Sequence, residues 1–200
     1  SFLVKALILD VLIDLSHLVF EAGRVITEEF VCNCLNLVRN RLGCKSYSIA
    51  PCAHHVESNR PSCTGIDTPT PSCVKQCDAA SSLSYSSDLS FGDTAYTVDN
   101  DEKQIQKEIL TNGPVEATFY IFPSSAIKCI LLGVYQHVAG DLDGGHAVKI
   151  IGWGVENDTP YWLAANSWNS DWGDKGYFKI LRGEDHMGIE SYIVAGTPKL

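Results

Sequence analysis

The sequence predicts an α+β fold, with helices and loops in its first half and strands in its second half. Apolar residues recur at helical spacing near the start of the chain. Five of the eight cysteines lie between residues 44 and 77, among Pro, Ser, Thr and Asn, which is typical of a disulfide-bonded loop region. β-Rich runs separated by Gly, Asn and Asp turns follow residue 115. The expected segments are 1–42 (divergent and helical), 43–92 (disulfide-rich) and 93–200 (β-rich).

The first expected helix covers residues 2–20, where Leu, Ile and Val form one apolar stripe. Lys5, Asp10 and Asp14 interrupt this stripe, whereas a membrane-spanning helix needs about twenty nearly uncharged residues. No small-residue cleavage site follows a short apolar core, which argues against a secretory signal. We therefore expect a helix that is buried in the fold or that contacts a partner.

Two further helices and a long loop are expected before the strands. A helix over residues 27–41 would end near Gly43, a residue that commonly terminates helices. Helical periodicity then disappears from residue 44 to residue 92, where four prolines punctuate a loop that the cysteines should order. A third helix is expected over residues 101–112, because a Gly-Pro pair closes it.

Five strands are expected after the third helix. Each run is apolar and rich in β-branched or aromatic residues, and turn residues bound it on both sides. The runs cover residues 115–122, 147–155, 161–165, 177–181 and 189–195. They predict a β-dominated second lobe.

Charge and cysteine usage narrow the classes of function. The formal net charge is −9, which argues against nucleic acid or an anionic membrane as a partner. Clustered cysteines favour an oxidising compartment, lysosomal or extracellular, that is reached by the secretory route. Zinc bound by Cys52, His54, His55 and Cys63 is the alternative use of this region. Structural zinc sites favour CxxC knuckles, which the sequence lacks, so we expect disulfides and neither a metal nor a cofactor.

A histidine and an asparagine together supply half of a catalytic site. His146 follows two glycines, and Asn166 begins an Asn-Ser-Trp motif twenty positions later. A histidine that acts as a base toward a nucleophile needs a partner that orients its ring. An amide oxygen can orient the ring without adding charge. No cysteine of the sequence lies in the local context that such a pair normally serves.

Several motifs resemble the papain family of cysteine peptidases, and within it the cathepsin B-like group. They include Gly43-Cys44-Lys45-Ser46-Tyr47, Pro51-Cys52-Ala53-His54-His55, Asn112-Gly113-Pro114-Val115-Glu116, Gly145-His146-Ala147, Asn166-Ser167-Trp168 and Trp172-Gly173. The resemblance covers residues 43–200, and residues 1–42 show none. It implies a papain-like two-lobe fold, with a complete β-rich right lobe and a fragmentary helical left lobe.

The resemblance also implies roles for individual residues. His146 would be the general base and acid, Asn166 would hold its ring, and Trp168 would shield their hydrogen bond from water. Tyr192 stands where the group keeps an acidic residue, so a preference for basic substrate side chains is not implied. The implied substrate-binding residues are His54, His55, Gly145, Trp168, Trp172 and Tyr192.

By the same resemblance, the segment around His54 and His55 is an occluding loop that receives the carboxyl terminus of a peptide. Cationic imidazoles binding a carboxylate would restrict cleavage to the removal of dipeptides. An ion pair between Arg60 and Asp171 would hold this loop down. The implied disulfides are Cys44–Cys77 and Cys52–Cys63, the partner of Cys73 is not evident, and Cys129 is expected to be a buried thiol.

The main departure from the family concerns the nucleophile. The family's Gln…Cys-Gly-Ser-Cys-Trp segment does not occur in the sequence. The early cysteines are Cys32 and Cys34, and only 146 − 34 = 112 positions separate Cys34 from His146, fewer than the roughly 130–150 expected. No glutamine precedes them and no tryptophan follows, so a structural role is preferred for both.

Three hypotheses follow. The first is part of a cathepsin B-like peptidase whose nucleophile lies outside this sequence, for example on a separate light chain. The second is a non-catalytic relative that binds peptides, and the third is a structural disulfide module. The combined motifs disfavour the third, and an abrupt match after residue 42 favours a fragment over a non-catalytic relative. The expected partners are peptide or protein substrates and, by resemblance, cystatin-like inhibitors and propeptides.

Overall fold

A computed structural model describes Cys44 and residues 51–53, 56–63, 74–88, 92–121, 133–142 and 144–198. The helices expected over residues 2–20 and 27–41 lie outside these ranges. So do His54, His55, Cys32, Cys34, Cys73 and Cys129. Within the described part of the chain, no helix has both the length and the apolar character needed to cross a membrane.

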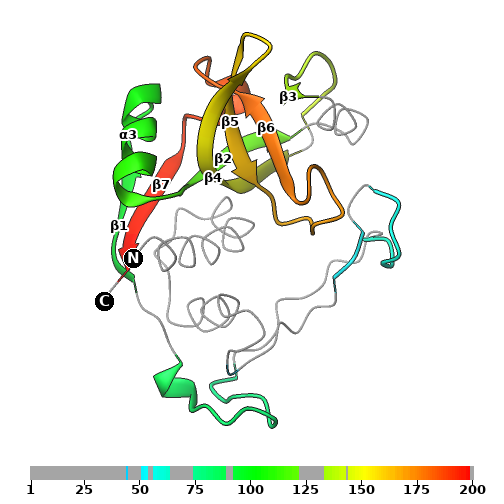
Figure 1. The fold of residues 1–200 in the computed structure, drawn as a ribbon, viewed down its shortest axis with the longest axis vertical. Coiled ribbons are helices and arrows are strands. Elements are labelled where there is room, and N and C mark those ends of the chain that lie inside the picture. The colour runs from blue at the N-terminus through cyan, green and yellow to red at the C-terminus, as the bar shows by residue number, and fades with distance from the viewer. Residues whose placement is uncertain are drawn as a thin grey trace.

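The described fold centres on one seven-stranded sheet (Figure 1). Its spatial order is β1-β7-β2-β4-β5-β6-β3, and the pairs are antiparallel except β3 with β6. The strands are β1 (Gly92–Val98), β2 (Val115–Ile121), β3 (Val134–Tyr135), β4 (Gly144–Glu156), β5 (Thr159–Ala165), β6 (Tyr177–Leu181) and β7 (Ile193–Pro198). Two short 3₁₀ turns accompany them, η1 (Tyr85–Ser87) and η3 (His186–Gly188).

Helix α3 (Glu102–Asn112) confirms the helix expected over residues 101–112. Asp101 caps its start, because the Asp101 carboxylate accepts the backbone N–H of Gln104 at 2.9 Å. Gly113 ends it with a φ of 103°, a left-handed value that suits glycine. Ile105 and Ile109 are buried one turn apart, so this face of α3 packs on the sheet, where the helix contacts β1, β2 and β4 (Figure 1).

The hydrophobic core lies between α3, one face of the sheet and the turns that follow β5 and β6. Val115, Ala117 and Phe119 alternate along β2 and point into this core, as the two-residue period of a strand requires. The largest fully buried side chains are Trp162, Trp172, Ile105, Ile150, Ile180, Ile189 and Ile193. The α+β prediction is confirmed by this arrangement.

The structure differs from the expected strands at three places. Strands β1 and β3 were not predicted, because polar residues interrupt the first and the second is only two residues long. The strand expected over residues 189–195 begins only at Ile193, because the preceding residues form η3 and a turn. The buried Glu190 carboxylate fixes that turn.

Both disulfides implied by the resemblance are present, Cys44–Cys77 and Cys52–Cys63. The second bond joins the two cysteines of the zinc alternative to each other. The zinc alternative is therefore wrong, because disulfide sulfurs carry no thiolate with which to bind a metal. Across the described ranges, no group of three or more His, Cys, Asp or Glu side chains is placed to hold a metal ion.

Candidate active site

Strands β4 and β5 bring His146 and Asn166 together. His146 lies near the start of β4, and Asn166 directly follows β5. The two strands are antiparallel, with Lys149 opposite Ala165, so the chain beyond Ala165 returns alongside His146. The His146 Nε2 atom lies 2.8 Å from the Asn166 Oδ1 atom. Two motifs twenty residues apart in sequence thus form one hydrogen-bonded pair.

A second hydrogen bond fixes which atom of the Asn166 amide faces the histidine. The backbone N–H of Ser167 donates to the same Oδ1 atom at 2.8 Å, so that atom is the amide oxygen. An amide oxygen only accepts, and Nε2 of His146 must therefore carry the proton in their bond. In the neutral ring, Nδ1 is then the nitrogen with a lone pair that can accept a proton.

Aromatic rings surround the His146 imidazole, which is only 6% exposed. The Trp168 ring lies over it with a centroid separation of 4.9 Å and a tilt of 31°. The edge of Phe119 meets it at 5.9 Å. Burial under these rings keeps water from competing for the His146–Asn166 hydrogen bond.

The other predicted substrate-binding residues differ in how much of each side chain is exposed to solvent. Trp172 is buried and packs between Trp168 and Phe178, with centroid separations of 5.2 Å and 5.6 Å. Gly145 precedes the histidine in β4 and lies opposite Tyr120 of β2. Tyr192 is 66% exposed, and its carbonyl accepts the backbone N–H of Thr118. Contact of Trp172, Gly145 and Tyr192 with a substrate stays a prediction, as do the roles of His54 and His55.

Glu116 is a buried acid for which the sequence predicted no role. It lies on the sheet face opposite the core residues of β2, in register with Lys149 of β4 and Val194 of β7. Burial raises the pKa of Glu116 to about 8 and lowers the pKa of Lys149. The signal was present in the alternation of β2, which puts Glu116 between two core residues and hence on the other face.

The disulfide loop (residues 51–63, described except for 54 and 55) contacts the turn that follows Trp168. The Arg60 Nε atom lies 3.2 Å from the Asp171 Oδ2 atom, as the resemblance implied. The Asn169 side chain donates from Nδ2 to the Cys52 carbonyl at 2.6 Å. Figure 1 shows the described parts of this loop beside the segment between β5 and β6.

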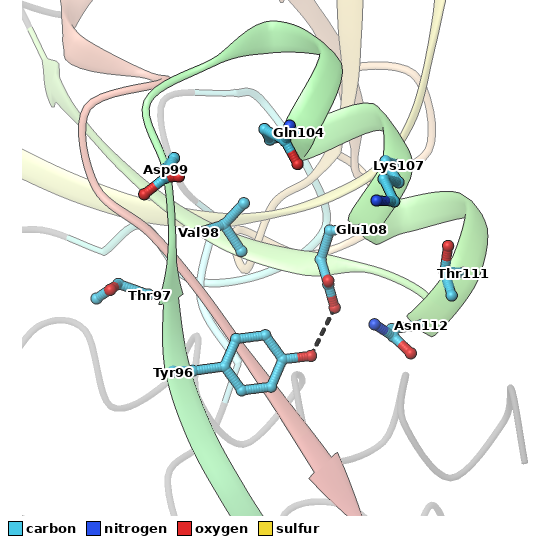
Figure 2. A pocket seen from close by; sticks show the side chains of 9 residues that line it. All are labelled: Tyr96, Thr97, Val98, Asp99, Gln104, Lys107, Glu108, Thr111 and Asn112. Carbon is cyan, nitrogen blue, oxygen red and sulfur yellow. Dashed lines mark hydrogen bonds between the residues drawn. The ribbon is translucent and has the colours of Figure 1, made fainter.

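A polar cavity of about 300 Å³ lies elsewhere, between β1 and α3 (Figure 2). The Tyr96 hydroxyl donates to the Glu108 carboxylate at 2.7 Å across it. Burial and this hydrogen bond raise the pKa of Tyr96 to about 12. Two strands, β7 and β2, lie between β1 and β4, the strand that carries His146, so this cavity is not part of the histidine–asparagine site.

The sheet, the buried His–Asn pair and the disulfide loop together define a cysteine-peptidase lobe. A model of the papain family of cysteine proteases matches residues 18–197, and the chain belongs to this family. The match begins before residue 43, so the absence of resemblance expected for residues 1–42 was wrong from residue 18 onward. The family match gives the class of protein to which the described site belongs.

Individual relatives are cathepsin B-like. The chain is 51% identical to cathepsin B-like cysteine proteinase 5 of Caenorhabditis elegans over 163 residues, which is 80% of this chain and 47% of the relative. It is 46% identical over 160 residues to a cathepsin B-like cysteine proteinase of Schistosoma japonicum, covering 80% and 46%. Among solved structures, procathepsin B S9 from Trypanosoma congolense matches with a TM-score of 0.56 and 40% identity, covering 64% of this chain and 42% of that one. The chain spans about half the length of the relatives it matches.

Proposed function

We propose that this chain forms part of a cathepsin B-like cysteine peptidase that hydrolyses peptide bonds with a Cys-His-Asn site. The chain contributes His146 and Asn166 to that site. The observation that carries the proposal is the 2.8 Å contact between the His146 Nε2 atom and an amide oxygen that the Ser167 N–H also holds. An oriented, buried imidazole of this kind is what an acid–base group in acyl transfer requires.

In the proposed reaction, His146 moves one proton in two directions. Its Nδ1 atom takes the proton of a cysteine thiol, and the resulting thiolate attacks the carbonyl carbon of the peptide. The protonated ring then gives that proton to the leaving amine, and an acyl-enzyme remains. Water, deprotonated by the same ring, releases the acid product and regenerates the thiol. Asn166 stabilises the imidazolium without itself changing charge.

The nucleophile of this reaction is proposed to come from outside the 200 residues. The sequence holds no Cys-Gly-Ser-Cys-Trp segment, and every described cysteine is part of a disulfide. A thiolate must lie in the same site as the histidine, so a light chain or a further part of the protein would carry it. The isolated chain is therefore expected to have no peptidase activity.

The proposed specificity is the removal of dipeptides from carboxyl termini. Support comes from the position of the disulfide loop. Its Cys52 carbonyl accepts a hydrogen bond from the side chain of Asn169, the residue that follows Trp168. His54 and His55 belong to this loop and are proposed to bind the terminal carboxylate of the substrate. The two disulfides support a lysosomal or secreted location, where such bonds persist. Cystatin-like inhibitors and propeptides are proposed partners.

Reconstitution tests the proposal directly. The purified chain is mixed with a polypeptide that carries a Cys-Gly-Ser-Cys-Trp segment, and release of a fluorescent dipeptidyl reporter is followed. We expect activity only in the mixture, and we expect it to be lost on His146→Ala, because the ring is the proton carrier. Activity of the chain alone would contradict the proposed division of the site.

A non-catalytic peptide-binding module is the second candidate, because the sequence lacks the nucleophile segment. Reconstitution separates the two candidates. A module of this kind would bind peptides with a free carboxyl terminus in the mixture and would release no reporter.

A further inference from the structure

We propose that Asn169 is a positioning residue that seats the disulfide loop by a neutral contact, independently of the Arg60–Asp171 ion pair. The proposal concerns the loop of the peptidase proposed above and rests on that function only for its effect on substrate selection. The contacts that carry it lie within the described residues of the loop and of the turn between β5 and β6.

Asn169 uses both polar atoms of its side chain on the loop. Its Nδ2 atom donates to the Cys52 carbonyl at 2.6 Å, and its Oδ1 atom accepts from the Arg60 Nη1 atom at 3.4 Å. A carbonyl can only accept and a guanidinium can only donate, so the two contacts agree on the orientation of the amide. One side chain thus bridges the disulfide end of the loop to the residue that carries its cation.

The backbone of Asn169 suits this bridging position. Its φ is 67°, in the left-handed region, which asparagine tolerates better than most residues. The Asn169 carbonyl accepts the N–H of Trp172 at 3.4 Å, which ties the turn to a buried ring of the core. The amide therefore extends from a turn that is anchored in the protein interior.

The second attachment of the loop is electrostatic. Arg60 pairs with Asp171 at 3.2 Å, and their side chains are 34% and 23% exposed. The Ser58 hydroxyl chiefly, then a backbone hydrogen bond and last the charge of Arg60, hold the pKa of Asp171 below its ordinary value. Asp171 therefore stays charged at weakly acidic pH, and salt is the variable that weakens this attachment. Salt does not screen the hydrogen bond from the neutral Asn169 side chain to the Cys52 carbonyl in this way.

Internal bonds order the described residues of the loop. The Cys52–Cys63 bond closes it, the N–H of Ala53 donates to the Pro61 carbonyl at 2.7 Å, and the N–H of Cys63 donates to the Ala53 carbonyl at 3.1 Å. Ala53 is only 6% exposed in the seated loop. The exchange rates of the Ala53 and Cys63 amides thus report whether the loop is seated.

The test measures these two exchange rates at pH 5.5 and at low and high salt in three variants. Asn169→Gly removes both side-chain contacts and accepts the positive φ, so we expect exchange about tenfold faster than in the parent. Exchange in this variant should rise further with salt, because the loop then depends on its contacts with the charged Asp171. Asp171→Asn should raise exchange less, and its rates should not depend on salt. Asn169→Asp keeps an acceptor for Arg60 but loses the donor to Cys52, so we expect exchange faster than in the parent.

Asn157→Gly is the matched control, because Asn157 is another asparagine with positive φ, at the exposed turn between β4 and β5. Unchanged protection of Val148 and Ile150 shows that each variant is folded. Rates in Asn169→Gly equal to those in the control would overturn the proposal, as would full loss of protection in Asp171→Asn. Amide exchange does not require peptide hydrolysis. The result can therefore be interpreted even if the proposed peptidase function is wrong.

Discussion

At the scale of single residues, one amide oxygen determines which nitrogen of the neutral His146 ring carries the proton. Asn166 accepts from Nε2, and the Ser167 N–H prevents the amide from turning over. Because the atom that faces Nε2 can only accept, it selects the neutral imidazole tautomer that carries its proton on Nε2. The orientation of the His146 ring is thus set by the residue that follows β5.

Replacement of Asn166 by alanine should release the ring. We expect nitrogen chemical shifts of His146 in the neutral state to change from the Nε2–H tautomer toward a mixture of tautomers. In the reconstituted enzyme, kcat/KM should fall about 10- to 100-fold, because part of the acid–base contribution is lost. A single tautomer that persists in Asn166→Ala would show that another group orients the ring.

Glu116 should give the protein a pH-dependent stability. Burial raises its pKa from 4.5 to about 8, so the native state holds a proton that the unfolded state releases. The stabilisation is complete below about pH 4.5 and is lost as the pH rises through 8. Across this pH range, the free energy of unfolding should fall by on the order of a few kcal/mol.

Thermal melts at pH 5 and pH 8 check this sign. The parent protein should melt at a higher temperature at pH 5, and Glu116→Gln should remove most of the difference, because glutamine stays neutral at both pH values. Glu108→Gln is the control, since Glu108 lines the polar cavity between β1 and α3, where its carboxylate accepts from the Tyr96 hydroxyl (Figure 2). A parent that is more stable at pH 8 would contradict the assignment.

At the scale of elements, one buried carboxylate organises the turn between β6 and β7. Glu190 is only 4% exposed and accepts from the Trp162 indole at 2.8 Å, the Gly183 N–H at 2.6 Å and the Asp185 N–H at 2.9 Å. Three donors satisfy the charge that burial would otherwise penalise. The turn therefore ends in a fixed position, from which Tyr192 leads into β7.

Glu190→Ala should lower the free energy of unfolding by about 3 kcal/mol or more, because three buried N–H donors lose their acceptor. Urea unfolding followed by tryptophan fluorescence measures the change. Glu184→Ala, in the same turn, should cost well under 1 kcal/mol. Equal costs for the two variants would show that the Glu190 bonds do not hold the turn.

At the scale of the whole molecule, the chain spans about half the length of the relatives it matches. We propose that part of the lobe that covers the sheet lies outside these residues, and we therefore expect the isolated chain to unfold over a broad temperature range. Calorimetry under oxidising conditions checks this expectation. A sharp cooperative transition would contradict it.

The disulfides should matter more for the isolated chain than for a complete enzyme. Cys44–Cys77 joins residues 33 positions apart, and loss of such a bond costs about 2–4 kcal/mol. Reductant should therefore abolish the residual transition of the isolated chain. The Cys77→Ser variant separates this bond from Cys52–Cys63, and it should reproduce most of the effect of reductant.

Local sequence patterns were sufficient for elements that carry their own signals. Helix α3 was predicted because Asp101, the spacing of Ile105 and Ile109, and Gly113 each act within one or two turns of chain. Strand β1 was not predicted, because its pairing with β7, about a hundred residues away, decides its structure. The predicted His146–Asn166 contact came from motifs and resemblance, not from periodicity.

The sequence by itself determined the fold class, the cysteine pairs implied by family motifs and the choice of His146 and Asn166, whose side chains the structure brings into contact. The tertiary structure decided the protonated nitrogen of His146, the raised pKa of Glu116 and the bridging role of Asn169. These properties depend on burial and on contacts between segments up to 117 positions apart. Hydrogen-bond direction and desolvation exist only once such segments have come together, so no local pattern could have specified them.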